Sequence, residues 1–206
     1  MEVYQEDFSD PRSGWPNRHD PLRNAHYRTH GGYELSRNFC PATAPVAASG
    51  EFVTQTDSVV AAYGPWWNNF RATATMKIAW GSRCPNGSKP AAGLLFHVME
   101  QGFYGLLVGH AAGNGLSFEL VRGMWGSPIF QLIPWTKLTS TPYDSGREYK
   151  LAVEYRRPTI KIDIDGRTVG TAQDTTFQYG LMGFGVFDKG RLDIGDLSVE
   201  ALLALE

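Results

Sequence analysis

The sequence has few of the features that mark nucleic-acid-binding, membrane or redox proteins. Its formal charge is −2 and its lysines and arginines do not cluster, so neither a nucleic acid nor an anionic membrane surface is expected as a partner. No apolar run reaches the roughly 18–20 residues that cross a bilayer, so membrane insertion is not expected. Only two cysteines occur, Cys40 and Cys84, and neither lies in a CxxC motif or beside a histidine. Thiol redox catalysis is therefore not expected.

The two cysteines leave two interpretations open. Each is followed by proline in a stretch of loop-like composition. A disulfide between Cys40 and Cys84 would close a loop of about 45 residues and stabilise the fold by about 4 kcal/mol in the chain-entropy model. The alternative is two unrelated free thiols, because one pair of cysteines does not define a disulfide framework.

The first residues, MEVYQEDF, lack the basic and apolar regions of a signal peptide. Two interpretations follow: the protein is cytoplasmic, or its sequence starts after a signal peptide that has been removed. Glu2 directly after a lone Met favours the second, and with it a secreted or periplasmic location.

What the sequence does contain is alternation, and the segment from Arg147 to Val169 shows it best. Apolar and polar residues alternate over 149–156 and again over 160–165, as in strands with one buried face. Pro158 separates the two runs, and Asp165-Gly166 ends the second with a turn dipeptide. The segment predicts a hairpin whose apolar face needs a second sheet to cover it. A slip of one residue would expose Ile160, Ile162 and Ile164, at about 1.5–3 kcal/mol each.

Shorter alternating runs continue along most of the chain. The 23 glycines and 12 prolines favour many turns over long helices, and only 200–205 is expected to be helical. A dozen or so short strands with almost no helix predict an all-β fold, a two-sheet antiparallel β-sandwich of jelly-roll type. At 206 residues the chain is expected to form a single domain, 1–206. Besides the hairpin and a short opening strand at Phe8, strands are expected at 33–36, 58–63, 70–80, 94–99, 103–108, 116–122, 129–133, 181–187 and 192–202.

Seven segments together resemble a known group of domains. These are EDFSDPRSGW (6–15), GGYEL (31–35), AAGLLFHVMEQGFYGLLV (91–108), LSFELVRGMW (116–125), EYKLAVEYRRPTIKIDIDGRTV (148–169), FQYGLMGFGVF (177–187) and DIGDLSVE (193–200). The chain resembles the concanavalin A-like, laminin-G-like jelly-roll domains of bacterial secreted proteins, related to the 3-keto-disaccharide hydrolase, or family-16-like glycoside hydrolase, family. The resemblance implies a concanavalin A-like jelly roll in which the first and last strands pair, with Phe8 beside Leu197 and Val199.

The fold that this resemblance implies carries lectins, glucanases and interaction modules alike, so activity must come from the residues. A retaining glucanase of this fold would carry ExDxxE on one strand, because its two carboxyls must flank one glycosidic bond at about 5–5.5 Å. No such spacing occurs: Glu119 stands alone in SFELVR, and Glu100 lies at a hairpin tip. Glycanase chemistry of that type is not expected. The resembling sequences often have arginine where His97 stands.

A carbohydrate-binding surface fits the residues better. If Phe96 and Val98 face the core, alternation places His97 on the exposed face of its sheet, and Glu119 falls on the same side. Sugars present hydroxyl edges and apolar CH faces, which polar groups and aromatic rings recognise. Trp66 and Trp67, in a loop that begins with Gly-Pro, form the expected stacking surface, with Tyr104 and Trp125 secondary. The predicted ligand-binding residues are Trp66, Trp67, His97, Tyr104 and Glu119.

The alternative is that one tryptophan of the pair closes the end of the sandwich and that His97 is an ordinary surface residue. On the binding interpretation, replacing Trp67 with alanine removes glycan retention without unfolding the protein.

No cofactor is predicted, and the sequence offers two candidate metal sites. His26 and His30 have the i,i+4 spacing of zinc ligands on a helix, but Pro21 and the following Gly-Gly favour a solvated loop. By resemblance, calcium is the metal to expect, with Asp7, Asp10 and Asp196 as oxygen ligands. The same aspartates are also ordinary turn residues.

The sequence thus predicts a lectin-like domain of a secreted bacterial protein that binds an oligo- or polysaccharide, and leaves open whether it is an enzyme. A second hypothesis is a glycoside hydrolase acting on a sugar or a 3-keto-glycoside, with Glu119, Glu100 or His97 as acid or base. A third is a protein-interaction module without a small ligand, which would show a flat, apolar exposed patch.

Overall fold

The computed structural model describes residues 2–18, 23–38, 58–80, 91–111, 115–142, 144, 146–187 and 189–203. These residues form strands joined by turns and irregular segments, and they include no helix of the length and apolarity needed to span a membrane. The strands are β1 (Val3–Glu6), β2 (Arg23–Tyr27), β3 (Tyr33–Arg37), β4 (Ser58–Trp67), β5 (Phe70–Trp80), β6 (Ala91–Val98), β7 (Gly102–Ala111), β8 (Gly115–Met124), β9 (Phe130–Pro142), β10 (Glu148–Arg156), β11 (Thr159–Ile164), β12 (Arg167–Gln173), β13 (Gly180–Phe187) and β14 (Gly190–Ala201).

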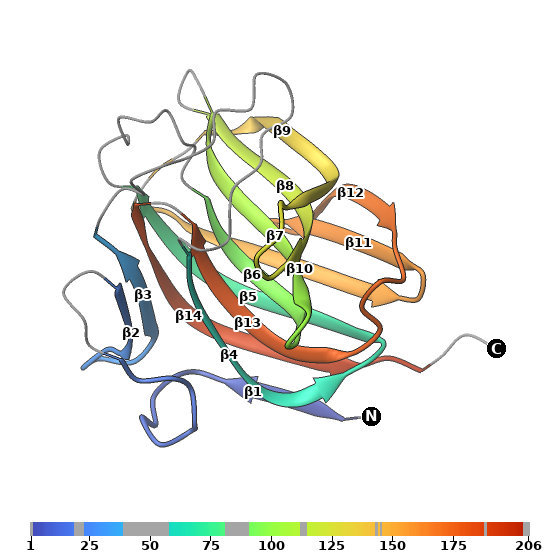
Figure 1. Cartoon of the computed structure of the whole chain (residues 1–206). Helices are drawn as coiled ribbons and strands as arrows, with labels where there is room; N and C mark the ends of the chain where they lie inside the picture. Colours follow the sequence, from blue (N-terminus) through green and yellow to red (C-terminus); the bar gives the residue numbers. More distant parts are fainter. Residues whose placement is uncertain are drawn as a thin grey trace.

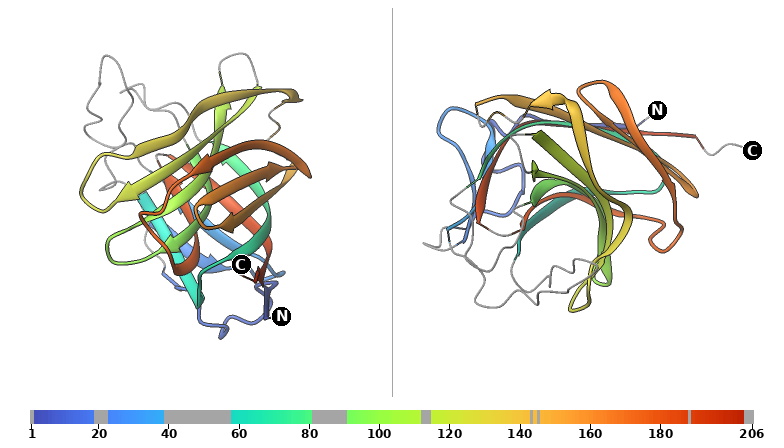
Figure 2. Two further views of the ribbon diagram at one scale, coloured as in Figure 1. Left: turned by 90° about the vertical axis from the view of Figure 1, so that its right-hand side faces the viewer. Right: turned by 90° about the horizontal axis from the view of Figure 1, so that it is seen from above.

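The strands form two antiparallel sheets that pack face to face (Figures 1 and 2). The eight-stranded sheet has the order β12-β11-β10-β5-β14-β3-β2, with β1 also paired to β14. The six-stranded sheet has the order β4-β13-β6-β7-β8-β9 and is strongly curved (Figure 2). The predicted all-β, two-sheet sandwich of jelly-roll type is confirmed.

The hairpin at 147–169 forms as its alternation predicts. Tyr155 pairs with Ile160 and Leu151 with Ile164, and the three isoleucines of β11 are at most 2% exposed. Asp165 and Gly166 have φ values of 51° and 77°, the left-handed conformation that the turn before β12 requires and that the Asp-Gly dipeptide tolerates.

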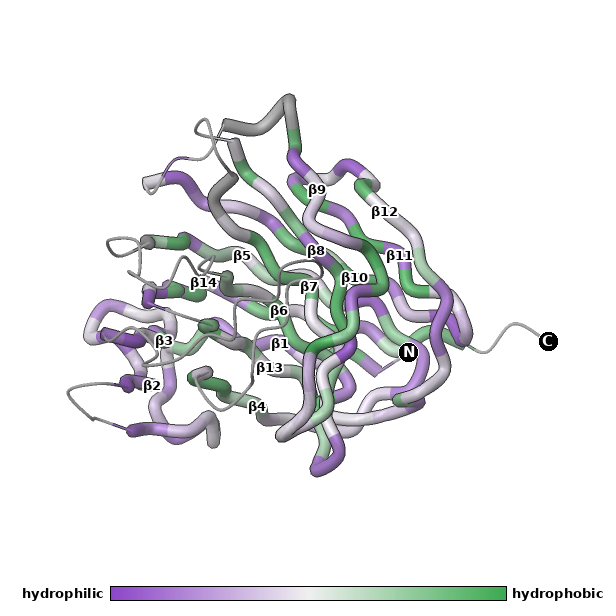
Figure 3. The backbone as a smooth tube through the Cα atoms, turned by 45° about the horizontal axis from the view of Figure 1, so that its top comes forward, coloured by the Kyte–Doolittle hydropathy of each residue, from purple (hydrophilic) through white to green (hydrophobic). Residues whose placement is uncertain are grey.

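The main core lies between the two sheets and draws on nearly every strand. Figure 3 shows hydrophobic residues concentrated on central strands such as β6 and β7, whereas the region of β2 is largely hydrophilic. One end of this core is aromatic: Phe8 packs on Trp15 and Tyr33 with ring centroids 5.3 Å apart in both cases, and on Phe184 at 6.3 Å.

A second apolar cluster covers the outer face of the six-stranded sheet. Every residue of β6 is buried, so this strand has no solvent-facing side. Gly105 on β7 makes room for the cluster, because a Cβ there would come within 3.0 Å of the Leu95 side chain. The cluster consists of Ala91, Leu95, Val98, Phe103, Leu107, Val121, Ile129 and Phe187.

Three predicted boundaries differ from the structure. The first and last strands do pair, but β1 ends at Glu6, which lies opposite Leu197, while Phe8 has left the strand with a φ of 57° and enters the aromatic core. β4 runs through the predicted loop to Trp67. The helix predicted from residue 200 is wrong as far as Ala201, because β14 stays paired with β5 to that residue.

The predicted orientation of His97 is also wrong. Between β13 and β6, Leu181 pairs with Val98 and Gly183 pairs with Leu95, so β6 carries one extra residue opposite β13. His97 takes up this bulge with a φ of 48°. The bulge shifts the alternation by one residue, and Phe96 and His97 both face the interior, where His97 is 0% exposed. Simple alternation fails because the bulge breaks it.

Replacing Ile162 with alanine should lower the free energy of unfolding by about 2–5 kcal/mol, because this fully buried side chain would leave a cavity in the core. The matched control is Lys161→Ala, the neighbouring position on the opposite face, which should change stability by less than about 1 kcal/mol. Urea unfolding measures both, and equal losses would contradict the assignment of the two faces.

Candidate functional site

The two adjacent tryptophans have opposite environments. Trp66 is 60% exposed, whereas Trp67 is 3% exposed and belongs to the main core. β4 has a bulge at this point. Gly180 pairs with Trp67 and Met182 pairs with Tyr63, so the three residues 64–66 of β4 lie opposite the single residue Leu181 of β13. The alternative drawn from sequence is correct that one tryptophan of the pair is buried, and wrong that His97 is a surface residue; the predicted binding role is left to Trp66.

Trp66 lies against an aromatic residue that the sequence did not single out. The centroids of Trp66 and Tyr179 are 5.4 Å apart with an angle of 37° between the rings, and Tyr179 is 52% exposed. Tyr179 immediately precedes β13, and the pairing of Gly180 with Trp67 brings the two segments together (Figure 1). Alternation places Tyr179 on the side of Leu181, which packs on the outer-face cluster. We call Trp66 and Tyr179 the aromatic pair.

His97 lies directly beneath the two segments that carry this pair. Its Nε2 is 3.1 Å from the carbonyl oxygen of Asn68, and its Nδ1 is 3.0 Å from the carbonyl oxygen of Phe177. The imidazole packs edge-on against Tyr155, with centroids 4.5 Å apart, and against Phe70 at 5.4 Å. Burial lowers the pKa of His97 to about 4, although both carbonyl contacts act in the opposite direction.

Tyr104, also predicted to contact ligand, is fully buried and supports the segment before β13 instead. Its hydroxyl donates to Oδ1 of Asp174 at 2.5 Å and accepts a hydrogen bond from the Phe177 backbone N–H at 3.0 Å. Burial raises the pKa of Tyr104, and the hydrogen bond to Asp174 raises it further. The phenol therefore stays protonated and works as a structural donor.

Asp174 anchors the same segment to β8. Arg122 donates to its Oδ2 at 2.6 Å and to the Thr176 hydroxyl at 2.7 Å. Burial acts to raise the pKa of Asp174, but hydrogen bonds from Tyr104 and Thr176 and the charge of Arg122 outweigh it, so the pKa lies below its usual value. The segment that presents Tyr179 is thus held by charged and neutral side chains from the four strands β6, β7, β8 and β10.

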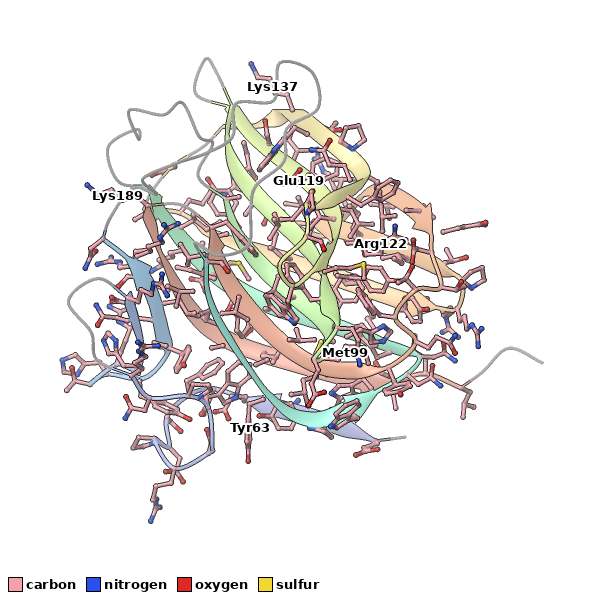
Figure 4. All side chains as sticks on the ribbon, viewed as in Figure 1. Tyr63, Met99, Glu119, Arg122, Lys137 and Lys189 are labelled. Atoms are coloured by element: carbon pink, nitrogen blue, oxygen red, sulfur yellow. The ribbon has the colours of Figure 1, made fainter. Side chains whose placement is uncertain are left out.

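Glu119 lies apart from the aromatic pair. It faces the outer side of β8, is 5% exposed, and accepts a hydrogen bond from the Gln131 amide at 2.7 Å. Figure 4 shows Glu119 and Arg122 along β8, with Tyr63 at the opposite, lower edge of the molecule. Glu119 is the only carboxylate on the six strands of its sheet. It was predicted on the correct face but as an exposed residue, which is wrong.

Trp125 makes no ring contact with the aromatic pair. It follows β8, two strands away from β6 and on the side opposite the edge strand β4. Its Nε1 donates to the Met99 carbonyl at 2.7 Å, and its ring packs on Phe103 with centroids 4.9 Å apart. Its 37% exposure leaves it accessible, but it does not join the aromatic pair.

The aspartates expected to hold calcium are not gathered at one place. Asp10 is paired with Arg12, and Oδ1 of Asp196 accepts the Thr75 N–H at 3.2 Å. Asp7 lines a separate pocket of about 350 Å³ beside β14, whose walls also carry the cations Arg28 and Lys77. Within the described part of the chain, no three histidine, cysteine or acidic side chains group to hold a metal ion. These three aspartates therefore do not fit a shared calcium site.

The predicted zinc spacing can be compared with the structure, whereas the predicted disulfide cannot. His26 lies in β2 opposite Glu34, and His30 lies in the following turn, so the two do not share a helix face. Cys40 and Cys84 lie outside the described residues.

The buried His97 predicts a loss of stability in mild acid. The unfolded chain takes up the proton near pH 6.5 and the folded chain only near pH 4, so the free energy of unfolding should fall as the pH drops between these values, by up to about 3 kcal/mol. His97→Asn has no titrating group and keeps a side chain that tolerates positive φ. Urea unfolding between pH 7 and pH 4.5 should give a shallower dependence for this variant, and an identical slope would contradict the assignment.

Comparison with solved structures identifies the fold of the chain. No family model and no curated protein matches the chain. Among solved structures it is similar to a carbohydrate-binding module, CBM66, from Bacillus subtilis, with 16% identity and a TM-score of 0.60 over 89% of this chain and 94% of that one. It is also similar to a Bacillus licheniformis β-glucanase, with 10% identity and a TM-score of 0.65 over 98% and 99%.

A third similar structure is a β-1,3-1,4-glucanase, or lichenase, from a mouse hindgut metagenome, with 10% identity and a TM-score of 0.61 over 98% of this chain and 100% of that one. At these identities the likeness establishes the fold. The narrower resemblance to the 3-keto-disaccharide hydrolase family stays a prediction. The chain has the concanavalin A-like jelly-roll fold of these glucanases and of this carbohydrate-binding module.

Proposed function

We propose that this protein binds carbohydrate, an oligo- or polysaccharide, through the aromatic pair Trp66 and Tyr179. The observation that carries the proposal is that two large rings lie in contact with each other while each keeps half or more of its surface in solvent. Aromatic surface in contact with water is less favourable than buried aromatic surface, so two adjoining exposed rings indicate a surface that a ligand covers. The apolar CH face of a sugar ring stacks on such a surface, and its hydroxyls remain hydrated at the edges.

The similar solved structures support a carbohydrate ligand. One is named as a carbohydrate-binding module, and two are named as glucanases. Their fold does not by itself transfer an activity, because one fold carries many functions. It does make a sugar the first class of ligand to test against an exposed aromatic pair. A polysaccharide ligand also fits a secreted or periplasmic protein.

Binding is favoured over hydrolysis by the distribution of carboxylates. Glycosidases of the common type need two carboxyls across the scissile bond, about 5–5.5 Å or 6.5–9.5 Å apart. The strands of the six-stranded sheet provide Glu119 alone, and Glu119 is buried and bonded to Gln131. His97, the other group considered as acid or base, is enclosed in the core. Neither residue adjoins the aromatic pair as part of an acid–base couple.

Replacing Trp66 with alanine should weaken glycan binding at least tenfold, about 1.4 kcal/mol, while leaving the melting temperature nearly unchanged, because Trp66 contributes to an exposed surface. Tyr179→Ala should act in the same direction. Trp125→Ala is the matched control, an exposed tryptophan whose ring packs on Phe103 and not on the pair, and should keep wild-type binding. A glycan array followed by affinity electrophoresis in polysaccharide gels, including β-1,3-1,4-glucan, measures all four proteins. Full retention by both Trp66→Ala and Tyr179→Ala would refute the proposal.

Replacing Trp67 with alanine should have the opposite signature. Because the ring is buried in the main core, its removal should lower the free energy of unfolding by about 3–5 kcal/mol. This outcome differs from the expectation drawn from sequence, that the variant loses only binding. Thermal or urea unfolding separates the two, and an unchanged stability would show that Trp67 is not part of the core.

A further inference from the structure

We propose that His97 is a positioning residue that fixes the separation of Trp66 and Tyr179, by donating its one N–H to one of the two chain segments that carry them while its buried ring lies against the other. The proposal rests on the proposed function for its importance to ligand binding. Its geometric part concerns the ligand-free protein and can be tested there.

The two contacts of the imidazole lie close in sequence to the two exposed rings. Nε2 of His97 faces the carbonyl of Asn68, two residues after Trp66, at 3.1 Å. Nδ1 faces the carbonyl of Phe177, two residues before Tyr179, at 3.0 Å. One rigid imidazole therefore lies between the two segments, within 3.1 Å of a backbone carbonyl oxygen of each.

The imidazole itself is held in place by the core around it. It is 0% exposed and lies in ring contact with Phe70, Phe96, Tyr104 and Tyr155. A left-handed backbone, uncommon for a residue other than glycine, directs the ring inward at the bulge of β6. Backbone held in an uncommon conformation by the surrounding structure is often found at functional sites, which supports a role for His97 beyond packing.

The chemistry of the two contacts limits the imidazole to one donated hydrogen bond. Both partners are carbonyl oxygens, which only accept, and a neutral imidazole has one N–H to donate. The titratable groups that face the ring are the phenols of Tyr104 and Tyr155, with Asp174 bonded to Tyr104 on its far side. Phe177 O has a second donor in the Tyr155 hydroxyl, at 3.4 Å. His97 can thus donate to one segment while Tyr155 assists at the other, and both segments stay attached to the same core.

The experiment uses three substitutions that keep different parts of the imidazole. The amide nitrogen of asparagine can replace Nδ1 and keep the bond to Phe177, that of glutamine can replace Nε2 and keep the bond to Asn68, and phenylalanine keeps the ring packing with neither donor. Binding to the polysaccharide that the wild type retains best should fall at least tenfold in His97→Phe. At least one of His97→Asn and His97→Gln should bind the polysaccharide at least threefold more tightly than His97→Phe does. Binding by His97→Phe at the wild-type level, or no recovery in either amide variant, would overturn the proposal.

A ligand-free measurement separates this proposal from the proposed function. The rings of Trp66 and Tyr179, 5.4 Å apart, should give inter-ring nuclear Overhauser effects in the wild type that are lost in His97→Phe and kept in one amide variant. Unchanged effects in His97→Phe would overturn the positioning role even if glycans bind. A wild type that binds no polysaccharide but shows these changes would refute only the function. If His97→Phe does not fold, the comparison of His97→Asn and His97→Gln with the wild type decides, and wild-type ring contacts in both would overturn the proposal.

Discussion

Burial of both faces of the six-stranded sheet determines where this protein can present a binding surface. Residues such as Leu95 and Leu107 fill the outer face as completely as Phe96 and Leu106 fill the inner one. The centre of the sheet therefore has no exposed side chains to offer a ligand. Exposed rings lie around its margins, such as Phe130 on the edge strand β9, and two of them, Trp66 and Tyr179, contact each other where β4 meets the start of β13.

Two bulges shape the end of the sandwich that carries the aromatic pair. On β4, extra residues before Trp67 send one tryptophan into the core and leave its neighbour in solvent. On β6, one extra residue turns His97 inward beneath the same region. Both interruptions lie against β13, at the end of the sandwich where Tyr179 enters that strand. Bulges typically redirect side chains next to functional sites, and here they separate an exposed aromatic pair from the buried polar group that supports it.

The sequence predicts regular strands well and these bulges poorly, for a physical reason. In β10 and β11 each apolar residue faces the core, so the alternation that can be read from Ile160 and Ile162 is the one that folds. In β6 the run Leu94–Val98 is apolar on both faces, and alternation carries no information about which side His97 takes. Tyr179 was missed because it precedes its strand, and only the pairing of Gly180 with Trp67 brings it to Trp66. Glu119 was placed on the correct face, but its burial depends on the curved, filled sheet around it.

An aromatic pair assembled from segments so far apart in the sequence needs more than its own contact to be ready for a ligand. A ring contact of this kind contributes about 0.5–1.5 kcal/mol, which is similar to the cost of ordering a side chain on binding. The remaining order must come from the buried groups beneath the pair. These are the hydrogen bond from Tyr104 to Asp174 and the imidazole of His97, which donates to one of the carbonyls of Asn68 and Phe177 and is held in place by the rings around it. Hydrogen bonds fix distance and direction, whereas apolar packing tolerates sliding. Placing polar groups inside this end of the core is therefore costly for stability in acid but favourable for a preorganised surface.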